Sequence, residues 1–273
     1  MPTSTTTAQA RDVQVLPIGP GTLALRSRTW DRLKFEIESS LKRGTTANSY
    51  LIEGRELALI DPPGKTFTET FLTTLADRLK GRRLDYVILG HVNPNRAATI
   101  EKLLEASNQP RFICSNPGAI ALRSLFPDRD LAIEVIRAEQ CFDFGLGHRL
   151  TFVPVPTPRW PDALATYDSA SQTLYTDKLF GAHVCGDQVF DEGWQVYEED
   201  RRFYFETLHA AQTRQVATAL NRFTDFAATT YAPAHGPIVR HGLHELQQAY
   251  RTWLQSQASQ EVTVALLYAS AYG

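Results

Sequence analysis

One short stretch of the chain, residues 89–96 with the sequence LGHVNPNR, has the form of a metal-binding loop without its acids. A pair of iron ions requires anionic oxygen atoms and neutral imidazoles around it. His91 supplies an imidazole, but the side chains of Asn93 and Asn95 that could supply oxygen are amides. The last residue, Arg96, is a cation. The stretch therefore suggests a scaffold built for two metal ions whose site chemistry has been replaced.

Composition narrows the class of protein. The chain has 273 residues, 43% of them hydrophobic, and a net charge of -2, which suits one large domain or two smaller ones. The small net charge argues against a nucleic-acid partner, and no apolar run is long enough for a membrane span. Three widely spaced cysteines without a CxxC pair (Cys114, Cys141 and Cys185) favour a cytoplasmic protein without disulfides, and we expect all three to be buried as small apolar side chains.

Apolar patterns predict strands and helices that alternate along the chain. Two of the strands deliver histidines onto loops, where sites normally assemble: His91 follows strand 86–89, and His235 follows strand 229–232. The interleaving predicts an α/β protein, a sandwich of two mixed sheets flanked by helices. Strands are also predicted at 13–16, 23–28, 49–53, 57–61, 111–114 and 173–176, a hairpin at 141–155, and helices at 67–79, 97–106, 119–125, 201–223 and 243–254.

The two ends of the chain differ from its middle. Residues 1–12 are Thr-rich and predict a flexible tail, and residues 13–256 form the main domain. Residues 262–268 are a continuous apolar stretch, typical of a strand buried on both faces of a parallel sheet. A run of small residues follows, where a phosphate-binding loop would begin. We therefore expect residues 257–273 to be a linker and the first strand of a second α/β domain.

Several separated motifs together resemble the metallo-β-lactamase-like domain of flavodiiron proteins, most closely the diflavin flavoproteins of cyanobacteria and other oxygenic phototrophs. The resemblance covers nearly all of residues 12–273. It implies the αββα fold of metallo-β-lactamases and identifies the second domain as flavodoxin-like. The motifs are NSYLI at 48–52, the loop within 88–96, PRWPD at 158–162, the segment 174–181, YAPAHGP at 231–237 and the tail 267–273.

The resemblance also implies which residues would be iron ligands. In the family, the first ligand loop has the pattern H-x-E-x-D-H, and the next ligand is a His directly before Trp-Pro-Asp. A bridging Asp comes shortly before Phe-Gly. The last ligand is the His of a Pro-x-His-Gly loop. His91 and His235 match this pattern. Asp177 remains an alternative for the bridging position, although a slip of one residue points a side chain to the other face. The positions that depart from the pattern are Asn93, Asn95, Arg96, Arg159 and Lys178.

These departures predict a site without a di-iron centre or a zinc pair. At an effective dielectric near 20, two unit charges ~4 Å apart interact by about 4 kcal/mol, so a cation beside a divalent ion costs roughly twice that. Either carboxylates turn toward the cations, with Asp61, Asp162 and Asp177 as candidates, or a small anion or water fills the pocket. The anion would bind Arg96, Arg159 and Lys178. Taken singly, Asn-Pro-Asn is also an ordinary turn, and both Arg159 and Lys178 could be surface residues.

The resemblance implies an oxidoreductase that passes electrons from NAD(P)H through flavin to O2, giving water, as a photoprotective sink for electron transport. FMN and a second flavin belong to the full-length protein, and this fragment is expected to hold neither. Three hypotheses follow. In the first, the chain is a subunit with an inactive metal site of its own, and it works in a head-to-tail homodimer or with a ligand-complete paralogue. In the second, it is a non-catalytic assembly or regulatory subunit that binds an anion. The third and least favoured is a hydrolase of the same fold, which would need the missing ligands.

Overall fold

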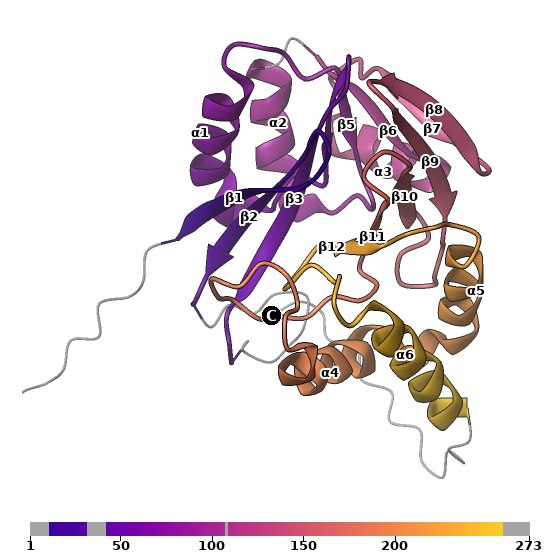
Figure 1. The fold of residues 1–273 in the computed structure, drawn as a ribbon. Coiled ribbons are helices and arrows are strands. Elements are labelled where there is room, and N and C mark those ends of the chain that lie inside the picture. The colour runs from indigo at the N-terminus through magenta and orange to yellow at the C-terminus, as the bar shows by residue number, and fades with distance from the viewer. Residues whose placement is uncertain (1–10, 32–41, 107–108, 259–273) are drawn as a thin grey trace, which may run out of the picture.

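A computed structural model describes residues 11–31, 42–106 and 109–258 (Figure 1). The expected tail, except for residues 11 and 12, and the expected strand of a second domain at 262–268 lie outside the described residues. No helix within the described ranges combines the length and apolar composition of a membrane span.

The first sheet has seven strands in the order of the chain. Neighbouring strands are antiparallel from β1 to β4 and parallel from β4 to β7. The parallel half brings the carboxyl ends of β4 and β5 to one edge, where their loops meet. The strands are β1 (Asp12–Gly19), β2 (Thr22–Thr29), β3 (Thr45–Glu53), β4 (Leu57–Ile60), β5 (Tyr86–Ile88), β6 (Arg111–Ser115) and β7 (Ile133–Ile136).

The second sheet has five strands in the order β12-β11-β10-β9-β8. Only β11 and β12 are parallel, so their carboxyl ends also lie together. The strands are β8 (Gln140–Gly145), β9 (His148–Pro154), β10 (Leu164–Asp168), β11 (Thr173–Asp177) and β12 (Thr230–Pro233).

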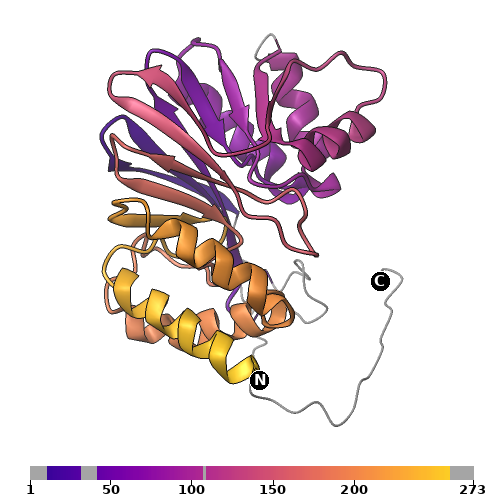
Figure 2. The same cartoon turned by 90° about the vertical axis from the view of Figure 1, so that its right-hand side faces the viewer.

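Helices cover the outer face of each sheet, which gives four layers (Figure 2). Helices α1 (Thr68–Leu79), α2 (Ala97–Ala106) and α3 (Asn116–Leu125) pack on the first sheet. Helices α4 (Glu198–Leu208), α5 (Thr213–Phe223) and α6 (Leu243–Ala258) pack against the second. A separate apolar cluster joins the facing sides of the two sheets. The expected αββα fold is confirmed.

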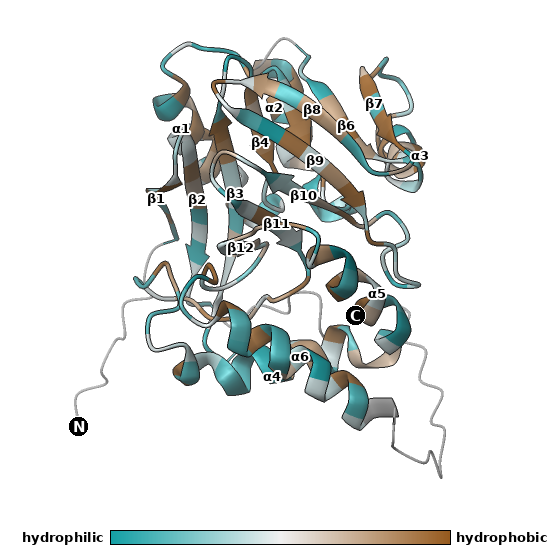
Figure 3. Ribbon diagram, turned by 45° about the vertical axis from the view of Figure 1, so that its right-hand side comes forward, coloured by the Kyte–Doolittle hydropathy of each residue, from teal (hydrophilic) through white to brown (hydrophobic). Residues whose placement is uncertain are grey.

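Local sequence accounts for the helices. In α1, Phe71, Leu75 and Leu79 repeat every four residues and form the buried face against the sheet. The helix ends at Lys80, which adopts a left-handed conformation. Helix α3 begins after Ser115, whose hydroxyl accepts a hydrogen bond from Gly118 N. Figure 3 shows mixed apolar and polar faces on α4 and α6, as expected of helices that cover a sheet.

Some sequence-based predictions are corrected. The single helix predicted at 201–223 is wrong: α4 and α5 are separated at His209, whose backbone is not helical. Its ring is hydrogen-bonded to Lys178 O, and this tertiary contact leaves no trace in the apolar pattern. Strands β7 and β10 were not predicted. Cys141 is exposed rather than buried and Cys185 is half-buried, whereas Cys114 is buried as expected.

Candidate functional site

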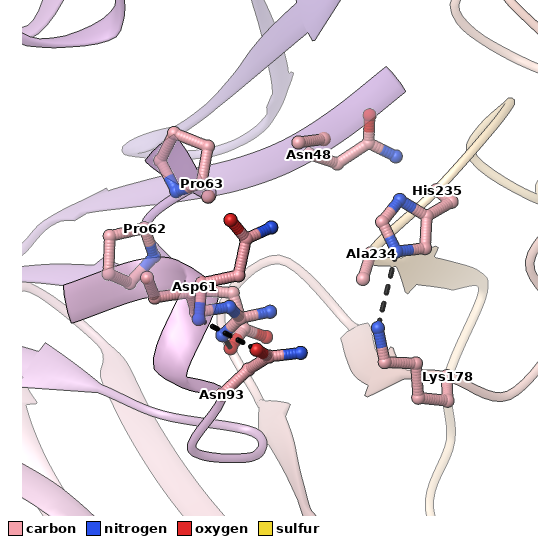
Figure 4. Close-up of a pocket in the computed structure, with 12 residues that line it drawn as sticks. Asn48, Asp61, Pro62, Pro63, Asn93, Lys178, Ala234 and His235 are labelled. Atoms are coloured by element: carbon pink, nitrogen blue, oxygen red, sulfur yellow. Dashed lines mark hydrogen bonds and ion pairs between the residues drawn. The ribbon is translucent and has the colours of Figure 1, made fainter. Parts of the chain in front are cut away.

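The loops that follow four strands meet at one edge of the sandwich, two from each sheet. Asp61 follows β4, His91 follows β5, Lys178 follows β11, and His235 follows β12. Asp61, Lys178 and His235 line a small cavity, with Asn48 of β3 on its other side (Figure 4), whereas His91 is not part of its lining. The cavity measures about 20 Å³, which is room for one water molecule by this measure.

Lys178 and His235 are hydrogen-bonded across this cavity, with Nζ 3.2 Å from Nε2. The other ring nitrogen of His235, Nδ1, lies 2.6 Å from Thr46 O. Because a carbonyl oxygen only accepts, Nδ1 must carry the proton and Nε2 must accept from the Lys178 ammonium. The Nε2 lone pair that could bind a metal is therefore already used.

His91 is paired with Asp177. Its Nδ1 lies 3.0 Å from Oδ1 and 2.9 Å from Oδ2, and both side chains are buried. Burial raises the pKa of Asp177, but His91, Lys178 and Arg96 together outweigh it and hold that pKa well below its usual range. Asp177 is therefore an ionised partner. The Nε2 of His91 is buried and has no hydrogen-bond partner within the part of the chain that the structure describes.

Arg96 is buried and its charge is balanced by Asp61. Arg96 Nη1 lies 2.5 Å from Asp61 Oδ1, and Arg96 Nη2 lies 3.9 Å from Asp177 Oδ1. The same Asp61 oxygen accepts from Gly90 N at 3.0 Å. A Cβ on Gly90 would lie 2.9 Å from both the Asp61 carboxylate and Asp177 Cβ, so only glycine fits between them. The prediction that Asp61 and Asp177 turn toward cations is confirmed.

Asp162, the third candidate carboxylate, binds a backbone N–H group. Its Oδ2 accepts from Val92 N at 2.6 Å, so it fixes the loop after His91 and is bonded to backbone instead of a cation. Asn93 Oδ1 accepts from Asn95 N at 2.8 Å and caps the short turn Pro94–Arg96. The Asn-Pro-Asn stretch is thus an ordinary turn, as the alternative interpretation held, and both amides also line the cavity.

The structure does not bring Arg159 together with the other two cations. Its side chain is exposed, lies over the Trp160 ring at 4.9 Å, and reaches toward Thr207 O. It is not among the residues that line the cavity. A guanidinium in solvent avoids both the cost of burial and repulsion by Lys178. Of the three cations predicted to bind an anion together, only Arg96 and Lys178 line the cavity, so the predicted grouping with Arg159 is wrong.

The residues present do not fit a metal pair. Among residues 11–31, 42–106 and 109–258, no group of three or more His, Cys, Asp or Glu side chains is placed to hold a metal ion. Near the cavity, Lys178 is hydrogen-bonded to Nε2 of His235, and Arg96 is hydrogen-bonded to the Asp61 carboxylate. Metal sites need anionic oxygen and free imidazole nitrogen. Of the ring nitrogens of His91 and His235, only Nε2 of His91 has no hydrogen-bond partner among the described residues, and one nitrogen atom does not hold two metal ions.

His209 was not among the residues expected at the site. Its Nε2 lies 2.9 Å from Lys178 O and so donates to it, which fixes the backbone that carries Lys178. Burial lowers the pKa of His209 to about 4, so the ring is neutral at neutral pH. Nothing in its sequence neighbourhood marks the contact, because the two residues are 31 positions apart.

Comparison with known proteins places this geometry in a family. The family described as ODP family beta lactamase matches residues 45–236. A crystal structure of diflavin flavoprotein A 5 from Nostoc sp. PCC 7120 (fragment 1–254) superposes with a TM-score of 0.87 at 50% identity, covering 92% of this chain and 98% of that one. The chain belongs to the flavodiiron protein family. The resemblance read from the separated sequence motifs is confirmed.

Two further relatives of this flavodiiron chain come from cyanobacteria. The metal-soaked flavodiiron core of Flv1 from Synechocystis sp. PCC 6803 has a TM-score of 0.89 and 56% identity, covering 92% of this chain and 63% of that one. Diflavin flavoprotein A 6 of Nostoc sp. PCC 7120 is 59% identical over 263 residues, which is 96% of this chain and 46% of the relative. The chain thus spans about half the length of the curated relatives it matches.

Proposed function

We propose that this chain is part of a subunit of a flavodiiron oxidoreductase that passes electrons from NAD(P)H through flavin to O2, giving water, with its own di-iron site free of metal. The observation that supports the proposal most is the hydrogen bond from Lys178 to His235 Nε2. It places an ammonium where the family pattern has a bridging carboxylate, against the nitrogen that would bind iron. A cation in that position repels a divalent ion instead of holding it.

The rest of the site supports the same proposal. Each acid that remains near the cavity is engaged: Asp61 by Arg96, Asp177 by His91, and Asp162 by Val92 N. Binding a metal would require these pairs to break and would leave buried cations without partners, at several kcal/mol each. Oxygen reduction would then depend on a ligand-complete paralogue in a hetero-oligomer. A head-to-tail homodimer of this chain would contain no complete metal site and would itself need such a paralogue to reduce oxygen.

The flavins belong to other parts of the proposed subunit. FMN would be held by a flavodoxin-like domain, to which residues 257–273 would contribute the linker and first strand, and a second flavin would be held by a further domain. The main domain, residues 13–256, would supply the scaffold and the surface that the partner contacts. In this proposal the fragment alone is inactive.

A second candidate is a non-catalytic assembly or regulatory subunit whose pocket binds an anion. Arg96 and Lys178 line the cavity, which favours this candidate. Its weakness is that Asp61 already pairs with Arg96 and that the cavity holds about one water-sized occupant. Chloride or water would fit this volume, whereas a larger oxyanion would not.

Iron content separates these possibilities. We expect the chain, expressed with excess iron and freed of loosely bound metal, to contain no stoichiometric iron. The matched variant carries five changes that recreate the family pattern: Asn93→Glu, Asn95→Asp, Arg96→His, Arg159→His and Lys178→Asp. It should gain iron, because three carboxylates and two histidines replace two amides and three cations. Stoichiometric iron bound to the unaltered chain between His91 and His235 would overturn the proposal.

Oxygen consumption by the full-length protein tests the need for a partner. We expect NAD(P)H-dependent oxygen uptake to be low for the protein alone and to rise when a ligand-complete paralogue is added, beyond the rate of the paralogue alone. Complex formation without a change in rate would favour the assembly subunit. Full activity of the protein alone would contradict both candidates.

A further inference from the structure

A second cavity lies under strand β2, beside the loop at 184–188. It measures about 230 Å³ and has no lining residue in common with the cavity at Lys178. Its lining includes Arg26, Arg43, Cys185 and Tyr197. The larger volume can hold an ion of several atoms, so the question is which chemistry the lining favours.

Arg26 determines which kind of ligand this cavity favours. Its side chain is fully buried, at 0% exposure, and Nη1 donates to two neutral acceptors, Gln14 Oε1 at 2.7 Å and Gln188 O at 3.0 Å. Its Nε is buried without a hydrogen-bond partner among the described residues. No ion pair of Arg26 with a described carboxylate occurs. The other buried arginines have such partners: Arg28 with Asp12 and Asp187, Arg96 with Asp61, and Arg201 with Asp191.

The groups around Arg26 are already committed elsewhere. The Gln188 side chain accepts from Tyr197 Oη and donates to Glu192, so its amide is used on both sides. Asp187, the acid that lines the cavity, is paired with Arg28. Of the described side chains that line the cavity, none is therefore placed to neutralise the Arg26 guanidinium.

Burial is the main cause that lowers the pKa of Arg26 to about 10, with Tyr50 and Cys185 acting in the opposite direction. The group remains a cation at neutral pH. A buried cation without a counter-charge costs several kcal/mol, and a bound anion would remove that cost. A guanidinium in turn gives its strongest hydrogen bonds to carboxylate and phosphate oxygens.

We propose that this cavity binds a small oxyanion, a phosphate or carboxylate group, with Arg26 as its central ligand. The anion would accept from the guanidinium, whose Nε has no hydrogen-bond acceptor in the part of the chain that the structure describes. Cys185 lines the same cavity, and burial raises the pKa of its thiol to about 11. The thiol is thus uncharged at neutral pH and does not repel an anion. The site is independent of the proposed electron-transfer function.

Alkylation of cysteines in the intact chain provides the test. Neutral iodoacetamide is added with inorganic phosphate or formate, or with potassium chloride at matched ionic strength, and the rate at each cysteine is read by peptide mass spectrometry. We expect phosphate or formate to slow modification of Cys185 severalfold, in a saturable way. Cys141 is exposed on β8, away from the lining, and its rate serves as the internal control. Equal rates at Cys185 with and without either oxyanion would overturn the proposal.

Variants identify the ligand. Arg26→Gln should abolish the protection, because it removes the charge and Nε together. Arg83→Gln, which alters an exposed arginine, should keep it, and so should Lys178→Gln, which alters the other cavity. Protection that persists in Arg26→Gln, or that disappears in Lys178→Gln, would overturn the assignment. If Arg26→Gln does not fold, isothermal titration of the unaltered chain with phosphate decides, since the absence of saturable binding there would also overturn it.

Discussion

At the scale of single residues, the negative charge of Asp177 balances the cations near the cavity at Lys178. It contacts His91 and lies within 3.9 Å of Arg96 Nη2, and Lys178 is its neighbour in the chain. Because these cations hold its pKa below the ordinary value of 3.8, the folded state favours the ionised form. The resulting stability is fully present above pH 3.8 and is lost as the pH falls through the lower pKa of the folded state.

We expect Asp177→Asn to lower the free energy of unfolding at neutral pH by about 3–5 kcal/mol, because it leaves buried cations without their counter-charge. Urea denaturation followed by circular dichroism measures the change. Asp225→Asn, which alters an exposed acid, is the matched control and should change little. A loss for Asp177→Asn no larger than that of the control would show that Asp177 does not balance the site.

At the scale of elements, the break between α4 and α5 fixes the site from behind. His209 interrupts the helical backbone and donates to Lys178 O, so a helix end determines where the lysine lies. The ring is surrounded by aromatic side chains, among them Tyr204, Phe205 and Trp160. This apolar surrounding explains why protonation of His209 is unfavourable in the folded state.

The pKa of His209 makes stability depend on pH in a defined window. Its pKa is about 4 in the folded protein against an ordinary 6.5, so the unfolded chain binds the proton first. Stability should therefore decrease as the pH falls from 6.5 toward 4, by about 3 kcal/mol. In His209→Phe this part of the pH dependence should vanish in urea unfolding experiments. His244→Asn, at an exposed histidine, should keep the wild-type curve.

A buried hydrogen bond links helix α6 to the segment that follows β11. Tyr250 Oη lies 2.9 Å from Phe180 N and accepts from it, and both residues are fully buried. Tyr250→Phe leaves this backbone N–H without a partner, and we expect the free energy of unfolding to fall by about 1–3 kcal/mol. Tyr167→Phe is a suitable control, because the structure gives its hydroxyl no hydrogen bond. Equal values for the two variants would contradict the expected role of Tyr250.

At the scale of the whole molecule, the two sheets are joined beside the cavity. Asn48 of β3 donates to the carbonyl oxygen of Pro233, the last residue of β12, at 2.9 Å and to Gly236 O, in the loop after it, at 3.0 Å. Its Oδ1 accepts from Thr46 Oγ1, which also accepts from Gly236 N. Thr46 O in turn accepts from His235. Backbone of one sheet thus orients the histidine delivered by the other.

We expect Asn48→Asp to be strongly destabilising, because it replaces the donor to two carbonyl oxygens by an acceptor in a buried position. The loss should exceed about 2 kcal/mol, larger than for Asn48→Ala, which removes the donor without adding repulsion. Urea denaturation compares the three proteins. If Asn48→Asp proves as stable as the unaltered chain, the join between the sheets does not depend on this amide.

Most elements could be predicted because their apolar periodicity is local. The helix at 97–106 has the predicted bounds, and the strand ending near Leu89 does deliver His91 onto a loop. The break at His209 could not be predicted, because the apolar pattern continues through it and only a distant carbonyl determines it. The exposed Arg159 could not be predicted either, because its position in the chain says nothing of which way a long side chain turns.

The hydrogen bond between Lys178 and His235 bears on whether folding of this domain depends on the supply of iron. A metal ion bound between these loops would hold them together, and its removal by a chelator would then weaken the contact between the sheets. Here the same loops are held by hydrogen bonds and ion pairs made of the chain alone. We therefore expect the domain to mature at the same rate in iron-poor and iron-rich cells, and to be indifferent to chelators.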